Sequence, residues 1–199
     1  MNAAALALAL TLAIWVAPSS PAAAAVIDFE SLADLESVTT QFPGLTFSNA
    51  TVLTAGISLN EFEFPPKSGV NVVFDNGGAI VIDFATPVAS VQGFFTYLTP
   101  VTFTAFDAAF NPIDVDTSAF SSNLALSGDP GSSPNELLHV GSGAGIAHVK
   151  IEGDPLGGSL TLDDLTAVPM PGTLTLVVSG IAGALGWQGV RRRRIAARE

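Results

Sequence analysis

The sequence contains no cysteine, which excludes disulfide bonds, thiolate metal sites and cysteine nucleophiles. Basic residues are also scarce, with 7 Lys and Arg against 18 Asp and Glu in 199 residues. Five of those seven, Arg191 to Arg194 and Arg198, lie near the C-terminal end. Residues 26–168 are therefore strongly acidic, and because such a region repels nucleic acid and anionic lipid head groups, we exclude nucleic-acid binding.

Aromatic side chains suited to stacking on sugars are scarce in the same region. Both tryptophans, Trp15 and Trp187, lie in the terminal apolar segments, and Tyr97 is the single tyrosine of the chain. Phenylalanines such as Phe84 and Phe103 share the parity of their aliphatic neighbours, which predicts that they belong to the core. This composition weakens a lectin-like interpretation.

Motifs of common catalytic sites are absent from the sequence. His139 and His148 are the only imidazoles, and neither lies in an H-E-x-x-H motif. There is no G-x-S-x-G elbow and no Gly-rich phosphate loop. We therefore interpret the chain as a non-enzyme, with both histidines as solvated or hydrogen-bonded strand residues. A glycosidase or lyase stays open as an alternative, because two carboxylates flanking a cleft would suffice for that chemistry.

The N-terminal segment has the pattern of a secretory signal peptide. An apolar run over residues 3–17 precedes a proline-containing break and the small residues Ala22 to Ala25. This pattern predicts cleavage after Ala25, with Ala24 as the alternative, and a signal peptide over residues 1–25. No Lys or Arg precedes the apolar run, so an uncleaved anchor is the competing interpretation.

From Val26 to Val168 the pattern changes to alternation with β-branched and aromatic residues, which predicts strands and no long amphipathic helix. The expected strands are Val26–Glu30, Leu45–Ser48, Val70–Phe74, Ala79–Phe84, Val88–Leu98, Val101–Asp107, Ile113–Asp116, Leu137–Gly141, Ile146–Glu152 and Ser159–Thr166. Segment 31–41 is expected to form a short helix or a turn, and the Ser-, Gly- and Pro-rich stretch 117–136 a loop.

Turn residues separate the strands. Asp75-Asn76-Gly77-Gly78 predicts a tight hairpin between its flanking strands, and Phe110-Asn111-Pro112 predicts another turn. Short strands at spacings of about ten residues predict an all-β fold, a two-sheet antiparallel β-sandwich of jelly-roll type. We expect one exported domain over residues 26–168.

Alternation also assigns side chains to faces. In 146–152 it directs Ala147, Val149 and Ile151 inward and the intervening His148, Lys150 and Glu152 to solvent. In the last strand the same count places Asp164 on the apolar face and Asp163 outside. A carboxylate on an apolar face needs a partner.

The C-terminal segment, residues 169–199, has three parts. A Pro-x-Pro precedes 18 residues without a charge, Thr173 to Val190, and then come four arginines. Eighteen helical residues span about 27 Å, which is enough for a single transmembrane helix. The arginines are expected to stay on the cytoplasmic side, which leaves residues 26–168 outside the membrane.

This tripartite arrangement resembles the sorting signal of PEP-CTERM proteins. Val168-Pro169-Met170-Pro171 looks like its proline motif, with Met in the position where Glu is usual, as in the VPLPA-type variant. The resemblance implies export from a Gram-negative cell, inner-membrane anchoring, processing by an exosortase-type enzyme, and delivery to the cell surface or exopolysaccharide matrix. Arg191, Arg192, Arg193 and Arg194 would complete the signal. Met170 leaves the exosortase class open.

Residues 26–168 also resemble a common cargo domain of these proteins. The resemblance rests on Ile27-Asp28-Phe29-Glu30, on the strand from Val101 to Ala108, and on Leu162-Asp163-Asp164-Leu165. Such domains look like carbohydrate-binding-module or discoidin-like jelly rolls, several of which hold a structural calcium ion where the first and last strands meet. This implies calcium ligands among Asp28, Glu30, Asp163 and Asp164, because hard carboxylates suit Ca²⁺.

The leading hypothesis is a non-enzymatic exported surface or extracellular-matrix protein, such as a biofilm component, that acts in adhesion or exopolysaccharide association. The alternatives are a calcium-stabilised carbohydrate-binding module and a glycosidase or lyase.

Overall fold

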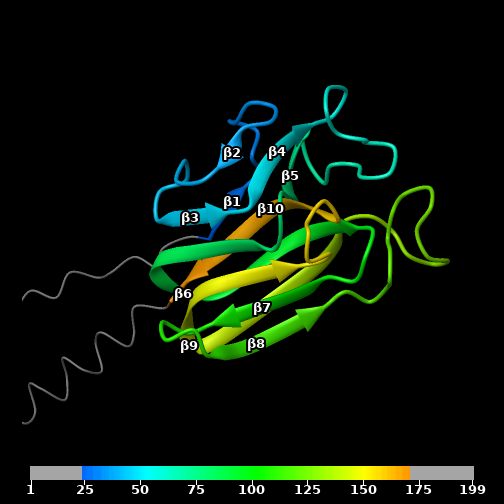
Figure 1. The fold of residues 1–199 in the computed structure, drawn as a ribbon. Helices are drawn as coiled ribbons and strands as arrows, with labels where there is room; N and C mark the ends of the chain where they lie inside the picture. The colour runs from blue at the N-terminus through cyan, green and yellow to red at the C-terminus, as the bar shows by residue number, and fades with distance from the viewer. Residues whose placement is uncertain (1–23, 171–199) are drawn as a thin grey trace, which may run out of the picture.

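The computed structural model describes residues 24–170, which form ten antiparallel-paired β-strands (Figure 1). The strands are β1 (Ala25–Ile27), β2 (Ser37–Val38), β3 (Leu45–Ser48), β4 (Ala50–Thr54), β5 (Asn71–Asp75), β6 (Ile80–Tyr97), β7 (Thr102–Phe106), β8 (Pro112–Thr117), β9 (Glu136–Glu152) and β10 (Leu160–Pro169). The all-β antiparallel prediction is confirmed. Within residues 24–170, no helix has the length and apolar character to cross a membrane. The expected transmembrane helix and most of the expected signal peptide lie outside the described residues.

Hydrogen bonds join all ten strands into one sheet rather than the two separate sheets that were predicted. This sheet forms two layers, because the long strands β6 and β9 each take part in both. Residues 80–84 of β6 pair with β3 and with residues 148–151 of β9, which continue to β7 and β8. We call this the β7 layer. Residues 88–97 of β6 pair with β10 and with residues 136–146 of β9, and β10 continues to β5, β4 and β2. We call this the β10 layer, and β1 pairs with its β10 strand.

The passage of β6 between layers occurs at residues 85–87, where its pairing register shifts. Ala85, Thr86 and Pro87 are exposed there, and Pro87 has no N–H to donate to a neighbouring strand. The sequence predicted separate strands on either side of this point and on either side of Gly141 to Ile146. The structure joins each pair into one bent strand, because an irregularity bends a strand without ending it.

The core lies between the two layers and holds the inward side chains of both. The predicted core positions Phe84 and Phe103 belong to it, as do Ala147, Val149 and Ile151, while His148 is partly exposed. The faces predicted for residues 146–152 are therefore confirmed. Its largest fully buried members are Tyr97, Phe29, Phe95, Phe103, Ile80, Ile82, Leu138, Ile146, Ile151, Leu160, Leu162 and Leu165.

The hairpin predicted at Asp75-Asn76-Gly77-Gly78 is wrong, although a turn does form there. β5 pairs with β4 and β10, and β6 pairs with β3, β9 and β10, so the turn connects two strands that do not pair with each other. The Asp75 carboxylate accepts hydrogen bonds from the backbone N–H of Ser159 at 2.8 Å and of Leu160 at 3.0 Å. This long-range contact fixes the end of β5 beside β10. Burial raises the pKa of Asp75.

Segment 31–41, expected to be a short helix or a turn, forms turns and then the short strand β2. β2 pairs with β4, and the alternation did not predict β4 as a strand. The predicted turn at Phe110-Asn111-Pro112 does join the paired strands β7 and β8, and residues 118–135 form the predicted loop.

Candidate functional site

The proline motif begins inside the folded domain. Val168 and Pro169 are the last residues of β10 and lie opposite Ser90 and Val88 of β6. Met170 is the last described residue, and Pro171 and Arg191 to Arg194 lie outside the described range. Half of the proposed sorting motif is therefore held extended against a neighbouring strand.

The face assignment of Asp164 in β10 was wrong. Asp163 lies on the outer face, as predicted, but is buried there by the loop segment that contains Lys67 and Ser68. Asp163 is 1% exposed, whereas Asp164 is partly exposed. The register between β10 and β6 shifts between Asp163 and Thr166, and Asp164 has a left-handed φ of 47°. A bulge adds a residue to one strand, so alternation counted across it changes sides.

Asp163 holds the segment that precedes β5. Its Oδ2 accepts hydrogen bonds from the backbone N–H of Lys67 at 2.8 Å and of Ser68 at 3.0 Å, and its Oδ1 accepts one from Asp164 N–H at 2.7 Å. Burial raises the pKa of this carboxyl to about 6, although the N–H groups favour its charged form. Glu30 acts on the same segment, because its Oε1 accepts from the N–H of Val70 and Asn71.

The other two expected calcium ligands also accept hydrogen bonds. Asp28 accepts from the N–H of Glu30 at 3.2 Å, and Asp164 accepts from the hydroxyl of Ser68 at 2.7 Å. Among residues 24–170, no group of three or more His, Asp or Glu side chains is arranged to hold a metal ion. In this geometry all four carboxylates accept hydrogen bonds from the protein itself. The calcium-stabilised module stays an alternative that chelation can test.

A different group of side chains gathers on the outer surface of the β7 layer, which we call the bare face. Its central residue is His148 of β9, which lies opposite Asp83 of β6 on one side and Phe106 of β7 on the other. The Nδ1 atom of His148 lies 2.6 Å from Oδ1 of Asp83, in a hydrogen bond between side chains. The predicted hydrogen-bonded role of His148 is confirmed.

Phe110 covers His148 from the β7–β8 turn. The two rings are stacked, with centroids 3.9 Å apart and planes 15° from parallel. The turn is held by Asp107, whose carboxylate accepts from the N–H of Ala109 and Asn111, and hydrogen bonds with Asn111 lower the pKa of Asp107. Phe110 remains 62% exposed, so one side of its ring rests on His148 while the residue stays open to solvent.

Polar residues continue along the bare face. Lys150 of β9 forms an ion pair of 2.9 Å with Glu152, and it lies opposite Val81 of β6 and Thr104 of β7. All of these side chains are at least partly exposed. The arrangement combines an apolar ring with hydroxyl, carboxylate, imidazole and ammonium groups, which suits hydrogen bonding to a polyhydroxylated ligand.

Sequence reasoning missed this group, because its members come from separate strands and a turn. A signal for Phe110 was present, since a phenylalanine in an Asp-to-Pro turn has no place in the alternation of a core. Tyr97, by contrast, is fully buried. Its hydroxyl donates to Glu136, and burial raises its pKa to about 12. Tyr97 therefore cannot serve as an exposed stacking platform.

No family model and no curated protein matches this sequence. Among solved structures, the chain is similar to the K2 cleaved adhesin domain of Lys-gingipain, with 15% identity over 73% of this chain and 99% of that chain and a TM-score of 0.47. It is also similar to a family 29 carbohydrate-binding module, with 13% identity over 75% and 94% of the two chains and a TM-score of 0.41. A family 61 module in complex with β-1,4-galactotriose gives 12% identity over 71% and 94%, with a TM-score of 0.39. At these values the alignments leave family and ligand open.

Proposed function

We propose that this chain is a non-enzymatic surface or matrix protein whose sandwich binds polysaccharide through the bare face. The observation that carries the proposal is Phe110 stacked on His148 beside Asp83. An exposed, rigid ring offers a large contact area to the apolar side of a sugar ring at low entropic cost. The hydroxyl, carboxylate and ammonium groups around it supply partners for sugar hydroxyls.

The backbone of Phe110 supports a binding role. Its φ is 59°, a left-handed conformation that is uncommon for a bulky residue other than glycine. Strained conformations of this kind cost about 1–3 kcal/mol and cluster at functional sites. Phe29 has a similar φ of 60° but is fully buried, so it is the exposure of the Phe110 ring together with its φ that leads us to assign this ring to ligand contact.

The charge of the domain favours a neutral polysaccharide as the ligand. Residues 26–168 contain Lys67 and Lys150 as their basic residues, together with all but one of the 18 acidic residues of the chain. Lys150 is already paired with Glu152. An acidic polymer would therefore meet a repulsive field, whereas a neutral polymer would not.

Affinity electrophoresis in gels that contain soluble polysaccharides tests this proposal. We expect the protein to be retarded by at least one neutral glucan, galactan or mannan and not by alginate, and Phe110→Ala to lose about tenfold in affinity. Phe62→Ala is the matched control, because Phe62 is also highly exposed, at 71%, but lies in the loop between β4 and β5. Equal retardation of both variants would contradict the assignment of the bare face.

We also propose that the two ends of the chain direct export and exosortase-type processing, as the signal-peptide pattern and Pro169-x-Pro171 suggest. Expression with a C-terminal tag in a host that carries an exosortase tests this. The expected product has lost both the tag and the signal peptide, as measured by intact mass. A tagged, full-length product that stays in the membrane would contradict the sorting proposal.

A further inference from the structure

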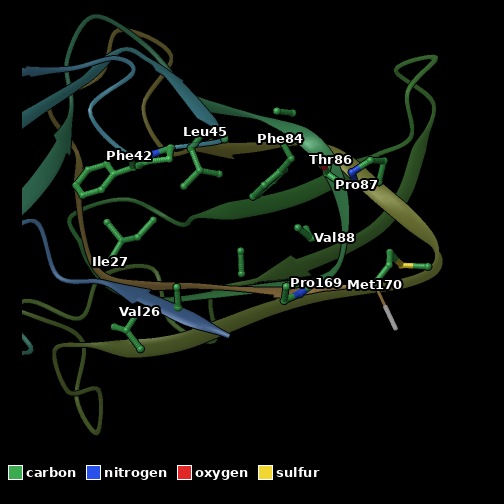
Figure 2. Close-up of a pocket in the computed structure, with 15 residues that line it drawn as sticks. Val26, Ile27, Phe42, Leu45, Phe84, Thr86, Pro87, Val88, Pro169 and Met170 are labelled. Atoms are coloured by element: carbon green, nitrogen blue, oxygen red, sulfur yellow. The ribbon is translucent and has the colours of Figure 1, made fainter. Parts of the chain in front are cut away.

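An apolar groove of about 730 Å³ opens between the two layers at one end of the sandwich (Figure 2). Residues on β1, on the end of β10, on the loop before β3 and on the β6 bend line it. They include Val26, Phe42, Leu45, Phe84, Thr86 and Met170. Figure 2 shows Leu45 and Phe84 facing Val26 and Pro169 across the opening.

None of these lining residues carries a charge, although the domain as a whole is strongly acidic. The lining includes the small residues Ala25, Ala85 and Ala167. Its apolar character extends to solvent-exposed positions, since the lining residue Val26 is 61% exposed. An uncharged, apolar opening of this kind on an acidic domain marks a contact surface.

Both ends of the described chain lie at this groove. Ala25 pairs with Ala167 in the β1–β10 ladder, and Met170 itself lines the opening. The uncharged stretch that begins at Thr173 follows Met170 by three residues, which span at most about 10 Å. Before the signal peptide is removed, the apolar run over residues 3–17 precedes Ala25 on the other side.

We propose that this groove is a membrane-contact surface, which rests on the bilayer while the chain is anchored. The proposal rests on the anchoring step of the proposed function. If Thr173 to Val190 spans the membrane, the connection of only two residues, Pro171 and Gly172, holds the groove at the lipid surface. The apolar lining then contacts the boundary between head groups and acyl chains, and the acidic surfaces elsewhere turn toward water, away from anionic head groups.

Environment-sensitive labels can test this contact, because a chain without cysteine accepts a single reporter anywhere. The full-length precursor, with its C-terminal segment retained, is reconstituted in phosphatidylcholine vesicles. A nitrobenzoxadiazole label is placed at Thr86→Cys on the groove. Ser127→Cys is the matched control, because it is also exposed but lies in the loop between β8 and β9 (Figure 1).

We expect doxyl-labelled phosphatidylcholine to quench the Thr86→Cys label at least about twofold and to leave the Ser127→Cys label unchanged, while iodide quenches the control. Iodide quenching at both positions would overturn the proposal, because the groove would then face water. Protection from both quenchers would also overturn it, since the chain itself or a second copy would fill the groove.

Flotation of the same vesicles separates this proposal from the anchoring step. Protein that fails to float with the vesicles contradicts both the membrane anchor and the groove contact. Protein that floats while its groove label is quenched by iodide contradicts the groove contact alone. Thermal melting of both labelled variants verifies that each remains folded.

Discussion

The two outer faces of the sandwich use acidic residues in opposite ways. On the β10 layer, loop segments cover the strands, and Asp163 accepts hydrogen bonds from backbone N–H groups of the covering segment. On the β7 layer, Asp83 is paired with a side chain, that of His148, and Glu152 with that of Lys150. On the β10 layer the carboxylate of Asp163 holds a loop segment over the strands, whereas on the β7 layer the carboxylates of Asp83 and Glu152 stay accessible to solvent.

The difference lies in what the partner can do. A backbone N–H group cannot leave its carboxylate unless the loop moves, so loss of Asp163 leaves buried donors without partners, which is costly. A long side chain such as that of Lys150 can rotate toward a ligand, and exposed ion pairs contribute little to stability. Acids of the same charge are therefore structural on the covered face and available for binding on the bare face.

The largest effect is expected from Asp163→Ala. This change leaves the N–H groups of Lys67 and Ser68 without their acceptor, and we expect the free energy of unfolding to fall by about 4 kcal/mol. Asp83→Ala on the bare face is the control, with an expected loss of no more than about 1 kcal/mol. Urea denaturation measures both variants. Equal losses would end the distinction between the two faces.

The free energy of unfolding should also depend on pH, because the Asp163 carboxyl is buried on the outer face of the β10 layer. The Asp163 carboxyl has a pKa of about 6 in the folded chain against an ordinary value of 3.8. Between these values the folded state binds more protons than the unfolded state, so this group lowers the free energy of unfolding as pH rises from about 4 to 6, by up to about 3 kcal/mol. Urea denaturation across this range should show the decline, and Asp163→Asn should flatten it.

Gly69→Ala tests how closely residues 67–70, which cover the outer face of the β10 layer, pack against Glu30. An added Cβ would lie 2.3 Å from the carboxyl carbon of Glu30, which accepts from the N–H of Val70 and Asn71. We expect a loss of about 2 kcal/mol. Gly77→Ala is the matched control, because Gly77 also has a positive φ but has open space around it. Thermal denaturation should show a smaller loss for the control, and equal losses would assign the cost to backbone strain alone.

On the bare face, His148→Ala removes the support beneath Phe110. We expect about a tenfold loss of affinity for the neutral polysaccharide, with stability changed by less than about 1 kcal/mol. Isothermal titration measures the affinity and urea denaturation the stability. Unchanged affinity would show that the stacking of Phe110 on His148 does not contribute to polysaccharide binding.

The smallest effect is expected from chelation. Because Asp28, Glu30, Asp163 and Asp164 already accept hydrogen bonds, we expect EDTA to shift the melting temperature by less than about 1 °C. A calcium ion bound where the first and last strands meet would instead be linked to folding, and its removal would lower the melting temperature by several degrees. Such a fall, shared without additivity by Asp164→Ala, would favour the calcium-stabilised module.

The local alternation of side chains predicted most of the strands. It failed where a bulge or a long-range pairing decides the structure. Alternation located β7 and β8 and assigned the faces of residues 146–152 correctly. It failed at Asp164, because the bulge after Asp163 reverses the side on which later residues fall. It also did not predict the loop segment that buries Asp163 on the outer face. It also missed β4, whose pairing with β5 and β2 is settled by contacts distant in sequence.

The sequence by itself determined the all-β character of residues 26–168, the acidity of that region and the positions of its turns, because alternation, charge and turn propensity are properties of neighbouring residues. The tertiary structure decided the rest. It separated the strands on either side of Asp75 to Gly78, placed Phe110 on His148, and brought Ala25 beside Ala167 at the groove. These outcomes depend on long-range hydrogen bonding and packing between layers, which no short window of residues contains.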